Sequence, residues 1–163
     1  MAEHIWTILS TKAVVDSHTN NLSLFDVLER ITLSGPGPTQ YKKGTTVLIP
    51  FSFSLITLWT RSDSKKPEKT KIRVTLFAPD KKSLFSHEPE IDLTKHQNRR
   101  VILNFKNFHL RGPGIYSYKV DMEKKGRKGN IWKNVANIPF EVIFDLEPKK
   151  SKTAKVLEIP IPV

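Results

Sequence analysis

The chain has no cysteine among its 163 residues. A disulfide framework, a thiolate metal site and a cysteine nucleophile are therefore excluded, and the absence fits a reducing cytoplasm. The sequence also has no run approaching the roughly 18 apolar residues that a membrane helix needs. Glu3 stands where a signal peptide would carry Lys or Arg. These absences predict a soluble, cytoplasmic protein without membrane contact.

Motifs for catalysis or cofactor binding are also missing. No G-x-S-x-G elbow occurs, and the Gly-rich stretches 35–38 and 112–114 place proline where a phosphate loop would need amide donors. The five histidines never stand at the i, i+2 or i, i+4 spacing of metal ligands. Potential ligands are densest from His87 to His96, where we favour a solvated turn. The sequence predicts a protein that is not an enzyme, with no cofactor and no metal.

What the chain does contain is a basic, globular composition. Lys and Arg number 27 against 16 Asp and Glu, a net charge of +11, and 38% of the residues are hydrophobic. The aromatic side chains can fill a core, and the positive field favours acidic or phosphate-rich partners. This length fits one domain. We predict that it spans residues 1–146, followed by a basic linker and apolar tail over residues 147–163.

Short stretches of alternating apolar and polar residues run through the chain. Residues 46–60 place apolar side chains on odd positions up to Leu55, after which Ile56 and Leu58 reverse the phase. A bulge, or a strand passing between sheets, would explain the reversal. Tyr118 and Phe140 lie on the apolar parity of two later strands and should point inward. Further alternations occupy residues 72–76, 101–105, 116–120 and 138–144.

The first third of the chain is less regular. Residues 5–15 and 22–33 are apolar on both parities, as strands covered on both faces are. Residues 16–21 between them bond readily to their own backbone, which predicts a hairpin. A helix over residues 24–31 is the alternative to a strand there. Together these patterns predict an all-β fold, an antiparallel β-sandwich of about seven to nine strands with an extended C-terminal tail.

Two motifs carry a resemblance to a known family. Residues 21–31 read NLSLFDVLERI, and residues 112–121 read GPGIYSYKVD. In these motifs and their order the chain resembles, over roughly residues 4–145, a family of small uncharacterised bacterial β-sandwich proteins with an LSL-x-x-x-x-E-R-I hairpin strand and a P-G-x-Y strand. The resemblance implies a compact β-sandwich and assigns no site residue. The basic composition and the extension after Asp145 depart from the family pattern.

Basic side chains gather in one predicted hairpin turn that holds no carboxylate. Such groups neutralise phosphates while an indole stacks on a base, which is how single-stranded nucleic acid is bound. The other interpretation, which we favour, is a solvated turn with its Trp packed in the core. The residues concerned are Lys124, Lys125, Arg127, Lys128, Trp132 and Lys133.

The C-terminal tail follows a second basic run and carries two prolines that confine it to an edge strand or an extended segment. We expect it to dock on a sheet edge of its own domain or of a partner. Its apolar residues are Val156, Leu157, Ile159, Ile161 and Val163.

The function expected from these features is protein contact. We predict a noncatalytic β-sandwich interaction module, either self-associating or an accessory component of a bacterial assembly. The alternative is a basic nucleic-acid-binding accessory protein. An enzyme whose site is assembled from distant strands is the third interpretation.

Overall fold

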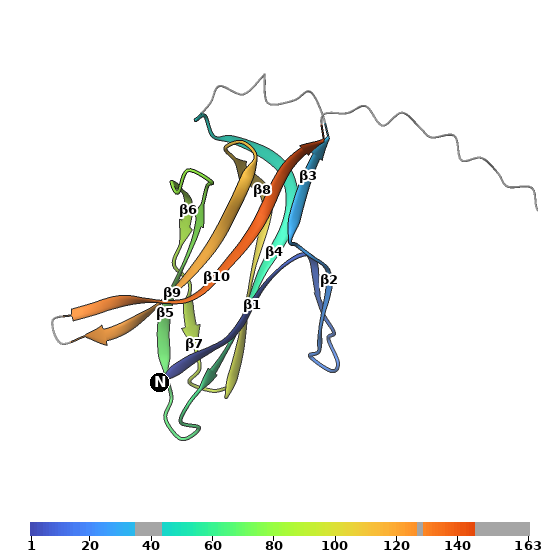
Figure 1. The fold of residues 1–163 in the computed structure, drawn as a ribbon. Helices are drawn as coiled ribbons and strands as arrows, with labels where there is room; N and C mark the ends of the chain where they lie inside the picture. The colour runs from blue at the N-terminus through green and yellow to red at the C-terminus, as the bar shows by residue number, and fades with distance from the viewer. Residues whose placement is uncertain (35–43, 127–128, 146–163) are drawn as a thin grey trace, which may run out of the picture.

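A computed structural model describes residues 1–34, 44–126 and 129–145 of the chain. Within these residues the chain forms β-strands and no helix, in two sheets packed face to face (Figure 1). The strands are β1 (Ala2–Val15), β2 (Leu22–Val27), β3 (Arg30–Ser34), β4 (Val47–Arg61), β5 (Lys69–Phe77), β6 (Ser83–His87), β7 (Glu90–Asp92), β8 (Asn98–Leu110), β9 (Gly114–Gly126) and β10 (Gly129–Asp145).

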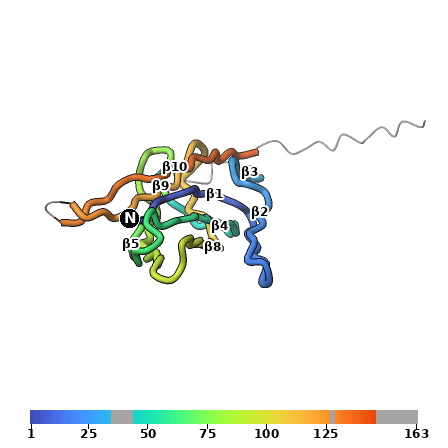
Figure 2. Tube along the Cα trace, turned by 90° about the horizontal axis from the view of Figure 1, so that it is seen from below, coloured from blue at the N-terminus to red at the C-terminus, as the bar shows by residue number. Residues whose placement is uncertain are grey.

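The first sheet has four strands in the order β2–β1–β4–β8. The second has the order β3–β10–β9–β5–β6, and β7 adds to it by pairing with β5. Figure 2 shows the two layers, with β9 and β10 on one side and β4 and β8 on the other. The predicted all-β sandwich is therefore confirmed.

The segment 22–33 forms two strands in different sheets. β2 ends at Val27 in the first sheet, and β3 begins at Arg30 in the second. Between them lies buried Leu28, whose amide donates a hydrogen bond to the Leu9 carbonyl at 2.9 Å. β3 then runs parallel to β10. The expected single strand over residues 22–33 was wrong, because the chain crosses between sheets at this point. The described residues form ten strands, close to the expected seven to nine, and β3–β10 is the one parallel pair among them in an otherwise antiparallel sandwich.

Strand β4 accounts for the change of phase at Leu55. Phe53, Leu55 and Trp59 all belong to the core cluster, so the strand keeps its parity, and it stays in one sheet. Ile56 lies on the opposite face and is also fully buried. The one irregularity in its pairing with β8 precedes Phe53. In its pairing with β1 the register shifts between His4 and Trp6, opposite Trp59 and Leu58, and the extra residue lies on β1. β4 itself therefore neither bulges after Leu55 nor crosses between sheets, and the reversal arises because both of its faces are covered here.

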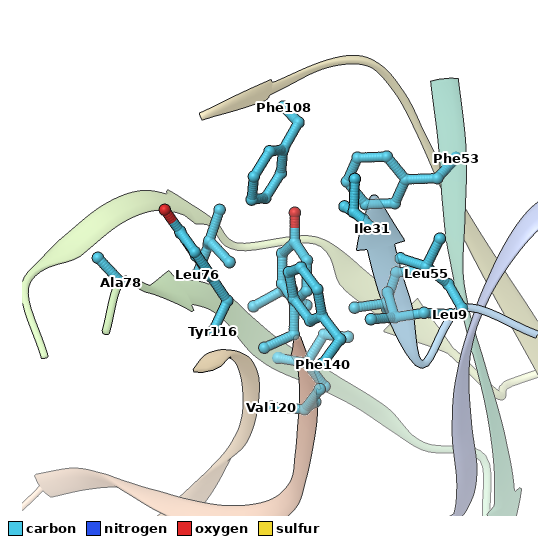
Figure 3. Packing of buried hydrophobic residues seen from close by; sticks show 14 of the residues in the cluster. Leu9, Ile31, Phe53, Leu55, Leu76, Ala78, Phe108, Tyr116, Val120 and Phe140 are labelled. Carbon is cyan, nitrogen blue, oxygen red and sulfur yellow. The ribbon is translucent and has the colours of Figure 1, made fainter. Parts of the chain in front are cut away.

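An aromatic cluster joins the two sheets (Figure 3). Phe140 of β10 stacks on Tyr116 of β9, with 5.7 Å between ring centroids, and meets the ring of Phe108 of β8 edge-on at 5.8 Å. Such pairs add to the stabilisation that comes from burying the rings. Tyr118 and Phe140 are only 1% and 2% exposed, which confirms that both point inward.

The hydroxyl of Tyr116 satisfies its hydrogen bonds at the edge of this cluster. It accepts from the amide of Arg111 and donates to the carbonyl of Gly112, both at 2.7 Å. Burial raises the pKa of Tyr116. Because both bonds go to the backbone of the turn between β8 and β9, the buried ring also holds that turn in place.

Phe140→Ala is expected to lower the free energy of unfolding by about 3–5 kcal/mol, because it opens a cavity between the sheets. Urea denaturation followed by circular dichroism measures the loss. Phe25→Ala is the matched control: Phe25 is 50% exposed and should lose less than about 1 kcal/mol. Equal losses in the two variants would contradict the register of β10.

Candidate functional site

The hairpin of β1 and β2, here the first hairpin, has an ordered turn. The side chain of Asp16 accepts hydrogen bonds from the amides of Thr19 and His18 at 2.6 and 2.9 Å. These bonds, those from Thr19 foremost, hold the pKa of Asp16 below its ordinary value. Asn20 adopts a φ of 57°, which asparagine tolerates better than most residues. The predicted hairpin, with side chains bonded to their own backbone, is confirmed.

The first hairpin bends away from the body of the sandwich. Asp26 has a φ of 50°, and the hydroxyl of Ser10 donates to the carbonyl of Phe25 at 2.6 Å, which pins the two strands together at the bend. Figure 2 shows the hairpin standing away from the layers on the side of β4 and β8. At its tip the guanidinium of Arg100 donates to the side-chain oxygen of Asn20 at 2.7 Å and to its carbonyl. The tip is thereby tied to β8.

A cleft of about 420 Å³ lies between the first hairpin and the outer face of the four-stranded sheet. We call it the hairpin cleft. Trp6, Leu58 and Arg100 form one row across β1, β4 and β8, because Trp6 is opposite Leu58 and Leu58 is opposite Arg100. Leu22 of β2 lines the cleft from the hairpin. Trp6, Leu22 and Leu58, all half-buried, give the cleft an apolar wall.

The polar side of the hairpin cleft is cationic. Arg99, Arg100 and His96 line it, and no carboxylate of the described residues does. Among the described residues, neither arginine forms an ion pair with Asp or Glu. The acceptors that Arg100 does have are the neutral oxygens of Asn20. Arg100 shares the outer face with the apolar wall, and Arg99, opposite Trp59 on the other face of β8, lines the cleft at the start of the strand. A cation beside an apolar wall attracts an anion that also carries apolar surface.

A smaller hollow of about 190 Å³ adjoins the hairpin cleft and shares His96 and Arg99 with it. This hollow contains Asp92, whose carboxylate already has two partners in the protein. Its carboxylate accepts from the hydroxyl of Thr94 at 2.6 Å and from Lys69 at 2.9 Å. These partners, Thr94 foremost, hold the pKa of Asp92 far below its ordinary value. Asp92 and Arg99 line the same hollow, and within the described residues the ion pair of Asp92 is with Lys69, not with Arg99.

The basic side chains of the turn predicted from sequence are divided between two faces. We call the hairpin of β9 and β10 the second hairpin. Residues opposite each other in antiparallel strands share a face. By the register of β9 and β10, Lys124 and Lys133 lie on one face, and Lys125 and Trp132 on the other. The other predicted members, Arg127 and Lys128, lie outside the described residues.

Trp132 is half-buried and lies outside the core cluster. The guanidinium of Arg73 covers its ring at 4.0 Å from the centroid, and Arg73 is itself paired with Glu88 at 2.6 Å. Glu123 lies directly opposite Trp132 on β9. The indole is therefore next to carboxylates as well as lysines, which the spacing of residues in the sequence did not reveal.

The base of the second hairpin borders a hollow of about 490 Å³. Lys69, Lys124 and Lys125 line it together with Glu68 and Glu123. Because charges of both signs are present, this hollow has no marked preference for an anion or a cation. The charged side chains that line the hairpin cleft are basic, so the cleft prefers an anion.

The remaining predicted features give no further site. Within residues 1–34, 44–126 and 129–145, no group of three or more His, Asp or Glu side chains could hold a metal ion. Glu90 of the dense group before His96 pairs instead with Lys69 at 3.5 Å. No helix in the described part of the chain is long and apolar enough to cross a membrane. The linker and tail, including Val156, Leu157, Ile159, Ile161 and Val163, lie outside the described residues.

Comparison with known proteins adds no assignment: no family model matches the chain, and no curated protein matches its sequence. The resemblance to small bacterial β-sandwich proteins stays a prediction.

Sequence reasoning missed the hairpin cleft. Residues 95–100, KHQNRR, are as basic as the turn that was singled out, and they contain no carboxylate. This basic run could have indicated Arg99 and Arg100 as candidate site residues from the sequence. The apolar wall could not have been found in this way, because Trp6, Leu22 and Leu58 come together only when the first hairpin bends.

Arg100→Ala is expected to loosen the first hairpin, because it removes both hydrogen bonds to Asn20. Amide hydrogen exchange of residues 14–23, followed by mass spectrometry, should become faster, while the free energy of global unfolding changes by less than about 1 kcal/mol. Arg99→Ala is the control, since Arg99 makes no hydrogen bond to the hairpin in the described structure. Unchanged exchange in the Arg100 variant would show that the tie does not hold the hairpin.

Proposed function

We propose that the protein is a noncatalytic interaction module that binds an acidic segment of a partner protein in the hairpin cleft. The observation that carries this proposal is the pair Arg99 and Arg100, without carboxylate partners, in a cleft with an apolar wall. As part of the proposal the module acts in the cytoplasm, which its lack of cysteine suits. By the resemblance to the bacterial family, we further propose that it is an accessory component of a bacterial assembly.

The chemistry of the cleft favours a peptide over a small inorganic anion. Guanidinium groups bind carboxylates through paired hydrogen bonds, so Arg99 and Arg100 suit Glu or Asp side chains. The half-buried Trp6, Leu22 and Leu58 offer apolar surface to a neighbouring aliphatic side chain of the same peptide. The net charge of +11 would speed the approach of an acidic partner at low salt.

A fluorescein-labelled peptide of alternating Glu and Val should bind the wild-type protein, as measured by fluorescence anisotropy. The double variant Arg99→Gln, Arg100→Gln should bind it more weakly by about 100-fold or more, because each of the two substitutions removes hydrogen bonds from a charged group that contribute about 1.5–3 kcal/mol. A peptide with Gln in place of Glu should not bind measurably.

The control variant is Lys124→Gln, Lys125→Gln. It lowers the net charge by the same amount but changes the second hairpin, so its affinity should stay within about threefold of the wild type. If both double variants lose affinity equally, general attraction and not the hairpin cleft is responsible. If neither does, an acidic segment is the wrong partner for this cleft.

Nucleic-acid binding through the second hairpin is a second candidate function. The observation that favours it is that Lys125 and half-buried Trp132 share one face, so that a lysine could neutralise a phosphate beside a stacked base. Glu123 on the same face opposes it. For this reason we rank it after the acidic segment.

Charge reversal at Lys124, Lys125, Arg127 and Lys128 tests this second candidate. If these residues contact phosphates, anisotropy with a labelled single-stranded oligonucleotide should show affinity that falls steeply with salt, and the four-site variant should lose it for unrelated sequences alike. The fluorescence of Trp132 should change on binding, in a protein whose other Trp residues are replaced by Phe. Equal weak binding by wild type and variant would reject nucleic acid as the partner of this hairpin.

A further inference from the structure

Strand β8 ends the four-stranded sheet. It pairs with β4 on one side, and no strand of the described chain pairs with its other edge. Its second half packs against β6, where Phe85 meets Phe105 and His109 with ring centroids 5.5 and 6.1 Å apart. Its first half, from Asn98, lines the hairpin cleft. A strand edge that forms no strand pair in the described chain, although β7 approaches β8, and a cationic cleft are therefore adjacent on one strand.

The charge of β8 decides which kind of strand could pair with this edge. The strand carries Arg99, Arg100 and Lys106 and contains no carboxylate. Two copies of β8 pairing edge to edge would bring like charges together, which is how edge strands avoid self-association. A strand that carries Glu or Asp would instead place opposite charges across the new pair, which is favourable.

We infer that the partner segment is an acidic β-strand that adds to the first half of β8, beside the hairpin cleft. This inference rests on the proposed function and specifies its binding mode. Main-chain hydrogen bonds to the open edge would provide affinity, and alternate side chains would provide specificity. Side chains on the outer face of the sheet would reach Arg100 and the mouth of the cleft, since Arg100 lies on that face in line with Leu58 and Trp6.

The alternation of a strand supplies the test. In an added strand, the amides of every second residue point toward β8, and the others point to solvent. We would use the alternating Glu–Val peptide at a length of about eight residues, enough to span the first half of β8 at roughly 3.4 Å per residue. One derivative carries N-methyl groups on the odd-numbered residues and the other on the even-numbered residues. Both keep the same charge and side chains.

One N-methylated peptide should bind about tenfold or more weakly than the parent, because it loses several hydrogen bonds, while the other stays within about threefold. Amide exchange in the first half of β8 should slow when the parent peptide is bound.

Equal affinity of the two derivatives, or displacement of the peptide by a shorter acidic peptide at equal affinity, would overturn strand addition and leave the acidic-segment function standing. If the parent peptide binds the Arg99→Gln, Arg100→Gln variant as tightly as the wild type, both the proposed function and strand addition are wrong. Tighter binding of an oligothymidylate at the same site would overturn both.

Discussion

The outer face of the four-stranded sheet is apolar, and the need to cover it shapes the side of the molecule that holds the cleft. Ile8, Ile56 and Ile102 lie side by side across β1, β4 and β8, and Ile56 is fully buried. An outer sheet face usually meets water, so this one needs cover from another segment. The first hairpin reaches over part of this face: its tip is tied to β8 through the hydrogen bonds from Arg100 to Asn20, and Leu22 shares the cleft with Trp6 and Leu58. The hairpin cleft is the space that this arrangement leaves open.

The distribution of charge follows from the same arrangement. The chain has eleven more basic than acidic residues, so some cations must lack a carboxylate. Arg111 pairs with Asp80 at 2.8 Å and Arg73 with Glu88 at 2.6 Å, on the side of the six-stranded sheet. Asp92, beside the cleft, is taken by Lys69 and Thr94. Arg99 and Arg100 are among the cations left without a carboxylate partner in the described residues, and apolar surface is accessible beside them.

The two hairpins show why a run of basic residues is a weak guide to a site. Lys124 and Lys125 are neighbours in sequence, yet they lie on opposite faces of the second hairpin because strand side chains alternate. Arg99 and Arg100 alternate in the same way, since Arg99 is opposite Trp59 of the core and Arg100 is opposite Leu58 of the outer face. Both nevertheless line the cleft, because they lie at the start of β8, where the cleft opens. The position of a basic pair relative to the strand end and to a covering segment decides whether its charges act together.

The sequence by itself determined the strand class, the turn at residues 16–21 and the inward direction of Tyr118 and Phe140, because these depend on local alternation and on turn chemistry. It could not determine that residues 22–33 divide between sheets, nor that Ile56 is buried on the second face of β4. Both depend on which segments meet across the sandwich. The hairpin cleft belongs with them: its basic run could be read at residues 95–100, whereas its apolar wall required Trp6, Leu22 and Leu58 to be brought together. Only the tertiary structure decides such contacts, since they join residues far apart in the chain.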